Sequence, residues 1–283
     1  MQSARGFEYG VKHIISPTSG LVDDVLMQQT ELNSQQVHFL LNLGAIYLNH
    51  NRLQENSSVS AGDYLRVHTK PRRFPKGDIN FKARVIYESK DFVVANKVSG
   101  IPVHGSVDNL KENFQAYMEE ALGTKLYITH RLDVPTNGLI VYAKTVEFQT
   151  AFNKILIARE IKKIYRAIIE GPVPSEKTLK HYMEPSPRAP KTVAKEAKEK
   201  WQECLLEILD STSIDSEYNE VKILLHTGRT HQIRAQMGFE KAPVKGDHTY
   251  GAKKQWEEER IELTACELEF TNPLSNEHHH FKI

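Results

Sequence analysis

A short block at residues 129–145, T-H-R-L-D-V-P-T-N-G-L-I-V-Y-A-K-T, has the composition of a site that could act on a substrate. Its one acidic residue, Asp133, follows Arg131 and precedes the turn-forming stretch V-P-T-N-G. A carboxylate held in a turn before a strand is within reach of a substrate, and it can serve as a nucleophile or as an acid or base. The same residue types also form ion pairs on protein surfaces, so this block alone leaves both interpretations open.

A second block, H-T-G-R-T-H-Q-I-R-A-Q-M-G at 226–238, contains the cations that such a carboxylate needs. Burial raises the pKa of a carboxyl group unless a nearby cation stabilises its charge. Arg234 is suited to that task because a guanidinium binds a carboxylate in bidentate geometry, whereas Arg229 fits a phosphate contact or a surface charge. Between the two blocks, K-K-I-Y-R places Lys163 and Tyr165 on one face of a predicted strand, because side chains alternate along a strand.

These motifs, with G-D-H-T-Y-G at 246–251, follow the order found in the RluA-type pseudouridine synthases, which the chain resembles over roughly residues 84–272. The matching motifs are H-R-L-D before T-x-G-L-x-V-x-A-K, then K-x-Y, G-R-T-H-Q-I-R and G-D-x-x-Y-G. The resemblance implies an isomerase that converts uridine to pseudouridine in structured RNA, with ribosomal RNA favoured over tRNA. It implies no cofactor and no metal ion.

The resemblance also implies roles for individual residues. Asp133 corresponds to the catalytic aspartate, which would attack the anomeric carbon, attack C6 of the base, or serve as a base at the sugar. Arg234 corresponds to its ion-pair partner and Tyr165 to the tyrosine that stacks on the flipped base. Arg131 corresponds to the residue that fills the place left by the extruded uridine, whose unstacking costs on the order of a few kcal/mol.

Further residues are predicted to contact the RNA substrate together with Arg131: His130, Lys97, Lys163, Arg229, Thr230 and His231. Lys97 lies in V-V-A-N-K-V-S-G-I-P-V-H, which resembles the entry strand N-K-P-x-G-x-x-V-H of the family. Two residues depart from the family pattern, with Val98 where proline is usual and Asn137 where serine is usual. Both substitutions keep the chemistry of the site, and the first loosens a turn.

The elements that position these residues are short strands interrupted by a few helices. Strands are predicted at 85–87, 92–95, 138–143, 164–169, 205–209 and 221–225. Apolar residues at helical spacing predict one helix from Leu110 to Leu122, ended by Gly123, and another from Phe148 to Leu156. This pattern indicates an α+β catalytic domain on a mixed or antiparallel sheet at 76–283. Residues 174–200 contain few apolar residues and are predicted to be an extended surface insertion.

The first 75 residues are predicted to form a separate small α/β module. Ser34 is the predicted cap of a helix that ends at Gly44, and strands are predicted at 46–48 and 64–67. The module resembles the αL-type RNA-binding module of a small-subunit ribosomal protein. A linker with Pro71 and Pro75 follows, and its cations are a predicted RNA contact: Lys70, Arg72, Arg73 and Lys76.

Overall composition sets further expectations. The formal charge of +1, from 37 cations and 36 anions, means that binding of a polyanion must depend on local clusters of basic residues. Cys204 and Cys266 are far apart in the sequence, which favours free thiols in a reducing compartment. Arg5, Glu8 and Lys12 lie at the N-terminus without an apolar segment, so no signal peptide is predicted. The sequence has no run of about 18 apolar residues, so no membrane span is predicted. We expect a cytoplasmic monomer with RNA as its partner.

Two other functions compete with the isomerase. The first is a catalytically silent RNA-binding or ribosome-assembly factor, although such a factor has no need to keep Asp133, Arg234 and Tyr165 together. The second is a metal hydrolase that would use His130, Asp133, His226 and His231. Their spacing does not form a compact ligand set.

Overall fold

The computed structural model describes residues 10–253 and 260–283. By their contacts these residues form two compact units, one of residues 10–79 with 104–120 and the other of the remaining described residues. Residues 104–120 belong to the first unit by their contacts, although they lie within the predicted catalytic domain at 76–283. Arg5 and Glu8, on which the expectation about a signal peptide rests, lie outside the described residues. No helix in the described ranges is long and apolar enough to cross a membrane.

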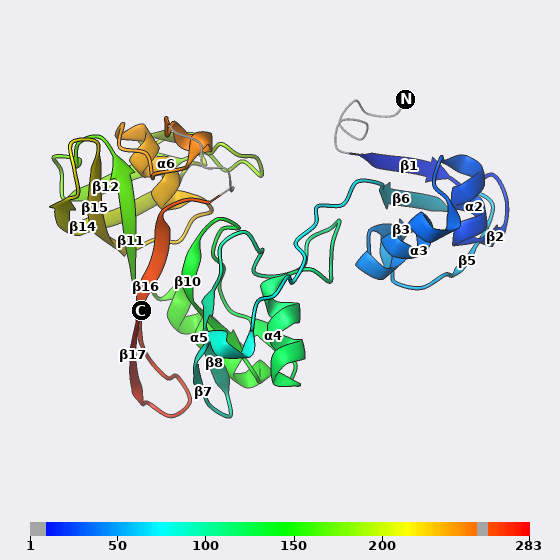
Figure 1. Ribbon diagram of the computed structural model, residues 1–283, viewed down its shortest axis with the longest axis horizontal. Helices are drawn as coiled ribbons and strands as arrows, with labels where there is room; N and C mark the ends of the chain where they lie inside the picture. The colour runs from blue at the N-terminus through cyan, green and yellow to red at the C-terminus, as the bar shows by residue number, and fades with distance from the viewer. Residues whose placement is uncertain (1–9, 254–259) are drawn as a thin grey trace. The chain divides into compact units, whose positions relative to one another are not determined.

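The first unit contains a small sheet with two helices (Figure 1). It also includes most of helix α4 (Phe114–Leu122). Its four antiparallel strands are, in spatial order, β1 (Val11–Ile15), β6 (Tyr64–His68), β3 (Ile46–Leu48) and β4 (Asn51–Leu53). Its N-terminal segment also contains the paired strands β2 (Gly20–Leu21) and β5 (Ser58–Val59) and the helices α2 (Val22–Gln29) and α3 (Ser34–Leu43). The predicted helix and strands of this module are thus present.

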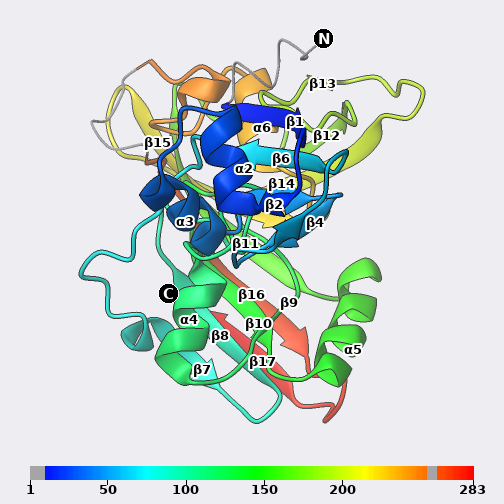
Figure 2. The ribbon, with the colours of Figure 1, turned by 90° about the vertical axis from the view of Figure 1, so that its right-hand side faces the viewer.

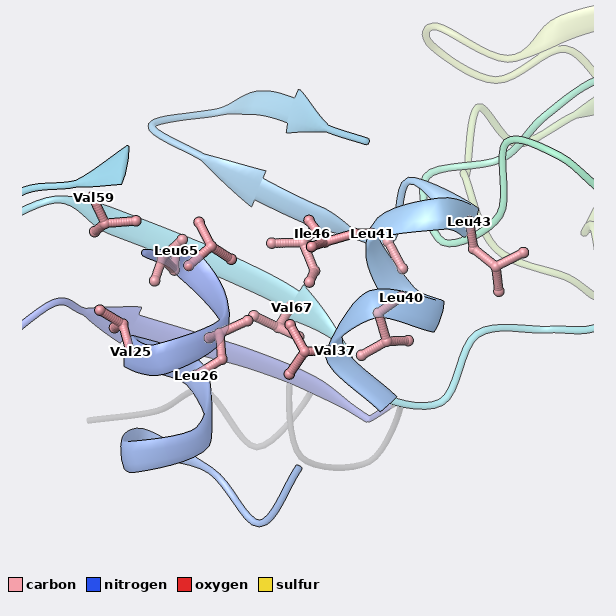
Figure 3. Packing of buried hydrophobic residues seen from close by; sticks show 12 residues of the cluster. Val25, Leu26, Val37, Leu40, Leu41, Leu43, Ile46, Val59, Leu65 and Val67 are labelled. Atoms are coloured by element: carbon pink, nitrogen blue, oxygen red, sulfur yellow. The ribbon is translucent and has the colours of Figure 1, made fainter. Parts of the chain in front are cut away.

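The two helices and the sheet of the first unit bury a common apolar core, shown in Figure 3. Leu26 and Val37 from the helices and Leu65 and Val67 from β6 are fully buried there. The helix α3 begins one residue earlier than predicted, since Asn33 and not Ser34 is its cap. The Asn33 side chain accepts a hydrogen bond from the backbone N–H of Gln36, and the Gln36 side chain accepts one from the N–H of Asn33.

Most of the basic linker is occupied by ion pairs within the first unit. The pairs are Arg72 with Asp108 (2.8 Å), Arg73 with Glu112 (2.6 Å) and Lys76 with Glu120 (2.7 Å). All three carboxylates lie in the segment 104–120, which explains why this segment groups with the N-terminal residues. These three cations were predicted to contact RNA. In the structure each of them is instead paired with a carboxylate of the protein.

The second unit is built on a mixed sheet of eleven strands, as the predicted fold class requires. The main path is β13 (Val193–Ala194), β12 (Thr178–Met183), β14 (Gln202–Ser213), β15 (Tyr218–Leu225), β11 (Lys162–Glu170), β16 (Leu263–Thr271), β10 (Asn137–Ala143), β8 (Phe92–Lys97) and β7 (Val85–Glu88). In addition β17 (His278–Lys282) pairs with β16, and β9 (Tyr127–Ile128) pairs with β10. All pairs are antiparallel except β10 with β16.

Helix α5 (Val146–Ile157) covers part of this sheet, as Figure 2 shows. Its Phe148 and Phe152 are fully buried and pack with Phe92 of β8 and Phe270 of β16. The predicted helix at 148–156 is confirmed. The other predicted helix, α4 (Phe114–Leu122), begins at Phe114 and not at Leu110.

The segment 174–200, predicted to be an extended surface insertion, contains the strands β12 and β13, which extend the sheet. Along β12 the inward positions are Leu179, His181 and Met183. The buried histidine interrupts the apolar alternation that would have marked a strand. Its ring nitrogens bond the side chains of Gln236 and Glu240, which makes its burial possible.

Candidate active site

A cavity of about 760 Å³ lies in the second unit. It is lined by the turn before β10, by β11, by α5 and by the turn that leads into helix α6 (Gln232–Phe239). Nine of the ten residues predicted for the site line this cavity, and the exception is Lys97. Residues from 130 to 234 in the sequence are therefore brought to one place by the order of the strands.

Asp133 contacts the guanidinium of Arg234, whose Nη1 lies 3.3 Å from Oδ2 of the carboxylate. The bidentate contact of Arg234, which was predicted for Asp133, is made instead with Asp247. Nε of Arg234 lies 2.6 Å from Oδ2 of Asp247, and Nη2 lies 2.9 Å from Oδ1. Asp247 is buried, being 1% exposed, while the Asp133 side chain is 14% exposed and lines the cavity. Burial alone would lower the pKa of Arg234, but the hydrogen bonds to Asp247 and the negative charges of Asp247 and Asp133 together raise that pKa.

His231 lies on the other side of the Asp133 carboxylate, with Nε2 3.9 Å from Oδ1. Its Nδ1 is 2.9 Å from the hydroxyl of Tyr250, which belongs to the 3-10 turn η2 (His248–Tyr250). Burial lowers the pKa of His231, and the negative charge of Asp133 opposes that effect without overcoming it. The imidazole is therefore mostly neutral at pH 7, so Arg234 supplies the positive charge next to Asp133.

Lys97 is fully buried and lies against the turn at residues 133–136, which contains Asp133. Its Nζ lies 2.8–3.3 Å from four backbone oxygens, those of Val98, Asp133, Val134 and Thr136. Burial lowers the pKa of Lys97 to about 7, against the attraction of Asp133. In this position the ammonium group binds the backbone of the turn and not RNA, so the structure differs from the predicted substrate contact.

Two predicted residues of the cavity are uncharged at neutral pH. Burial, with a contribution from the charge of Lys163, lowers the pKa of His130 to about 3. Its Nε2 accepts a hydrogen bond of 3.1 Å from the backbone N–H of Val141, as a neutral imidazole can. Burial raises the pKa of the Tyr165 hydroxyl, and the charge of Asp133 raises it further, so this hydroxyl remains protonated.

The described residues that line the cavity include five basic side chains and a single carboxylate, that of Asp133. The five are Arg131, Arg159, Lys163, Arg229 and Arg234. Arg131, Arg229 and Thr230 are exposed at the cavity. Burial lowers the pKa of Lys163, whose Nζ would lie 3.3 Å from a Cβ placed on Gly228. The cavity is thus strongly basic although the whole chain is nearly neutral.

Several residues without a predicted role stabilise the segment 226–238, which contains Arg229, His231 and Arg234. Thr227 donates a hydrogen bond to Gln232, and Gln232 in turn donates one to the buried Gln236. The backbone N–H of Arg229 donates to the same Gln232 side chain, which fixes the turn before α6. Asp247 and Tyr250 were not predicted as site residues. Their position in the motif G-D-H-T-Y-G is the sequence feature that could have identified them.

The described residues do not contain a group of three or more histidine, cysteine or carboxylate side chains that could hold a metal ion. The set proposed for a metal hydrolase, His130, Asp133, His226 and His231, is accordingly not assembled. Cys204 and Cys266 are both buried and unpaired.

Comparison with known proteins places this site in a family. A family model described as RNA pseudouridylate synthase matches residues 91–238. The chain is 36% identical over 245 residues to RNA pseudouridine synthase 6, chloroplastic, of Oryza sativa subsp. japonica, covering 78% of this chain and 48% of that protein. It is 29% identical over 254 residues to ribosomal large subunit pseudouridine synthase D of Neisseria meningitidis, covering 83% of this chain and 67% of that protein. The chain spans about half the length of the rice protein and of its counterpart in Arabidopsis thaliana.

A solved structure titled Human RNA Pseudouridylate Synthase Domain Containing 4 has the same fold. It superposes with a TM-score of 0.56 at 22% identity, covering 72% of this chain and 90% of the human chain. The fold, the ordered motifs around Asp133 and a family model that matches more than half of the chain agree. This chain belongs to the RNA pseudouridylate synthase family.

Proposed function

We propose that this protein isomerises specific uridines of structured RNA to pseudouridine, with ribosomal RNA as the substrate. The observation that carries the proposal is the Asp133 carboxylate, paired with Arg234 in a cavity that otherwise offers basic and neutral side chains. Membership of the family supports it. The similarity to a protein named as a ribosomal large subunit enzyme, over 83% of this chain, supports the choice of ribosomal RNA.

The charge distribution fits an RNA substrate. Proteins bind nucleic acid backbones with lysine and arginine, and arginine binds phosphate oxygens in bidentate geometry. Arg131 and Arg229 are exposed at the cavity, and neither guanidinium has a hydrogen bond or ion pair with another described residue. Both are therefore available to phosphates on either side of an extruded uridine.

The reaction breaks the bond between N1 and the anomeric carbon, turns the uracil and joins its C5 to the same carbon. C5 loses a proton and N1 gains one, so no water, oxidant or reductant is consumed. Asp133 is the group that acts on the uridine, and Arg234 pairs with its carboxylate at 3.3 Å within the cavity. Tyr165 presents a protonated hydroxyl and an aromatic face, which suit stacking on the free uracil and donation of a hydrogen bond to it.

The site that holds the carboxylate is preorganised through the backbone. Lys97 binds the carbonyl oxygens of Asp133, Val134 and Thr136, which fixes the turn that presents Asp133. Asp247 fixes Arg234 on the opposite side. Neither residue needs to touch RNA for the reaction to depend on it.

Carbodiimide-based mapping of pseudouridine in ribosomal and transfer RNA tests the function. We compare cells with the gene, cells without it, and deletion cells that carry wild type, Asp133→Asn or Asp210→Asn. Asp210 is an exposed carboxylate on β14 that does not line the cavity, so its variant serves as the matched control. We expect one or a few ribosomal sites to disappear on deletion and to return with wild type and the control only.

Three results would contradict parts of the proposal. Sites lost only from tRNA would reject ribosomal RNA as the substrate. Modification restored by Asp133→Asn would reject the role of this carboxylate. Purified protein that binds unmodified transcripts and never forms pseudouridine would favour the RNA-binding factor.

Location and assembly are part of the same proposal. We expect the protein to act as a cytoplasmic monomer, whereas the two plant relatives carry the word chloroplastic in their names. Fractionation of the source cells with immunoblotting tests the location. Sedimentation of the purified protein tests the monomer.

A further inference from the structure

The turn that joins α5 to β11 lies at the cavity but contains no residue with an assigned role. Arg159 in this turn lines the 760 Å³ cavity and also a second cavity of about 270 Å³. The two cavities share Ile161, Leu225 and His226 as well, so they are neighbours and Arg159 lies between them. Asp133 and Arg159 therefore line the same cavity, and Arg159 also borders the second one.

We propose that this turn is a second RNA contact, in which Arg159 binds a backbone phosphate next to the target uridine and Ile157 packs on the adjoining base. The inference rests on the proposed function, because it identifies where the strand beside the uridine lies. Its ligand class is a phosphodiester with a flanking nucleobase.

The backbone at Arg159 has the geometry of a helix end. Arg159 has φ of 62°, in the left-handed region that favours glycine. Its N–H donates to the carbonyl of Leu156 and that of Glu160 donates to Ile155, which is the hydrogen-bond pattern of a helix end. Glycine would satisfy this geometry with less strain, so an Arg159→Gly variant removes the guanidinium without disturbing the local backbone.

The guanidinium of Arg159 has the properties of a phosphate site. It is exposed, and among the described residues it makes no hydrogen bond or ion pair. Asp133 is the one carboxylate among the described residues that line the larger cavity, and it is already paired with Arg234. A phosphate is therefore the anion that the site lacks, and an arginine binds it without competition from within the larger cavity.

The neighbouring side chains fit a nucleobase. Ile157 is 83% exposed and lines the larger cavity, which leaves a large apolar side chain in water beside a basic groove. Asn153, one turn earlier in α5, is half-buried in the lining. Among the described residues its amide makes no hydrogen bond, so it can pair with a base edge. Covering Ile157 with a base removes apolar surface from water.

The test compares Arg159→Gly with Lys241→Gly. Lys241 is also an exposed cation with positive φ (59°) at a helix end, but it does not line the cavity. Both variants lose one charge and relieve the same backbone strain, so thermal melting should show both unchanged or raised. Binding of a fluorescently labelled oligouridylate to each protein is measured by anisotropy over a range of salt concentrations, in an Asp133→Asn background.

We expect Arg159→Gly to weaken binding about tenfold and to reduce the slope of log K against log salt by about 0.7, as loss of one phosphate contact on a single strand predicts. Lys241→Gly should keep the affinity and slope of the parent, and Arg159→Lys should recover most of the affinity. Equal affinities and slopes for the two glycine variants would overturn the phosphate contact. Since binding is measured in an inactive background, this outcome is independent of whether the protein makes pseudouridine.

The base contact is tested with Ile157→Ala against Val146→Ala. Val146 is 56% exposed at the other end of the same helix and does not line the cavity. We expect Ile157→Ala to weaken oligouridylate binding severalfold and to leave binding of an abasic polydeoxyribose phosphate unchanged. An effect of equal size on both probes, or no effect on either, would reject the base contact.

Discussion

Arg234 lies between two carboxylates and binds them unequally. Two of its nitrogens contact Asp247, and a third reaches Asp133 at 3.3 Å. The buried Asp247 therefore fixes the guanidinium, while the more exposed Asp133 keeps the freedom to approach a substrate. The same cation thus serves one structural and one reactive carboxylate.

This asymmetry predicts that the two aspartates respond differently to the same substitution. Asp247→Asn removes one partner of a buried ion pair and should lower the free energy of unfolding by about 3 kcal/mol. Asp133→Asn should lower it by less than about 1 kcal/mol, yet it should reduce pseudouridine formation by about 10³-fold or more. Urea unfolding and single-turnover assays of both variants measure the two effects. Equal losses of stability would contradict the asymmetric sharing of Arg234.

Lys97 predicts a specific dependence of stability on pH. Its pKa is about 7 in the folded protein, well below the value of about 10.4 expected in the unfolded chain. Between these values the unfolded chain binds a proton that the folded protein does not, so the free energy of unfolding rises with pH. Below pH 7 both states are protonated and the effect of this group is constant.

Lys97→Met removes that titration. We expect the free energy of unfolding of the wild type, minus that of the variant, to rise between pH 7 and pH 9 by up to about 1.4 kcal/mol per pH unit. Urea unfolding of both proteins at several pH values gives the difference. A difference that stays constant or falls over this range would show that the buried ammonium remains charged, held by its four carbonyl contacts.

At the scale of elements, the strand that follows Asp133 depends on one glycine. Gly138 has φ of 115° and pairs with Ala265 in the parallel contact of β10 and β16. A Cβ at this position would lie 2.3 Å from the carbonyl oxygen of Ala265. The two backbones approach so closely that no other residue fits without moving β10.

Gly138→Ala should therefore lower the free energy of unfolding by about 3 kcal/mol or more, since it adds a backbone clash to an unfavourable φ. Gly100→Ala is the matched control, because Gly100 has φ of 83° and nothing within 4 Å of its missing Cβ. It should cost only the strain of the left-handed region, about 1–2 kcal/mol. Similar losses for both variants would exclude the clash as the main cause.

Sequence patterns predicted the elements whose apolar residues alternate plainly. Helix α5 and strands such as β10 follow from their spacing of apolar residues. Strand β12 was not predicted, because the polar His181 occupies one of its inward positions. The hydrogen-bond partners of His181, Gln236 and Glu240, lie far away in the sequence. The first unit likewise includes residues 104–120 because of ion pairs between distant segments, which no local pattern reveals.

The site was predictable to the extent that motifs mark residue types. The motifs named Asp133 and Arg234, and the fold brings them together across 101 positions of sequence. The motifs could not show that Lys97 binds backbone carbonyl oxygens or that Asp247 makes the bidentate contact with Arg234. Both contacts depend on tertiary packing. Arg159 had no motif at all, and only the shape of the cavity identifies it.

At the scale of the whole molecule, the charges are balanced in number but not in place. The chain has a formal charge of +1, while the lining of the cavity has five basic side chains and one carboxylate among its described residues. Three of the four linker cations, Arg72, Arg73 and Lys76, are by contrast paired with acidic residues of the same unit. Attraction for RNA should therefore come from the cavity and fall steeply with salt.

A salt titration tests this distribution. Three exposed arginines at the cavity, Arg131, Arg159 and Arg229, predict a slope of log K against log salt of about −2 for single-stranded RNA. Arg73→Ala in the linker should leave that slope unchanged, because its guanidinium already binds Glu112. A slope near zero for the wild type, or a clear reduction on Arg73→Ala, would place the RNA contact elsewhere.

The position of β16 in the sheet also governs when the site can come into existence. β10, which follows Asp133, and β11, which carries Tyr165, are not neighbours, since β16 lies between them. β16 begins at Leu263, after every residue that we assign to the reaction has been synthesised. A growing chain on the ribosome would therefore hold both halves of the site without a strand to join them. Competence to bind uridine should appear late and abruptly, once that last central strand is inserted.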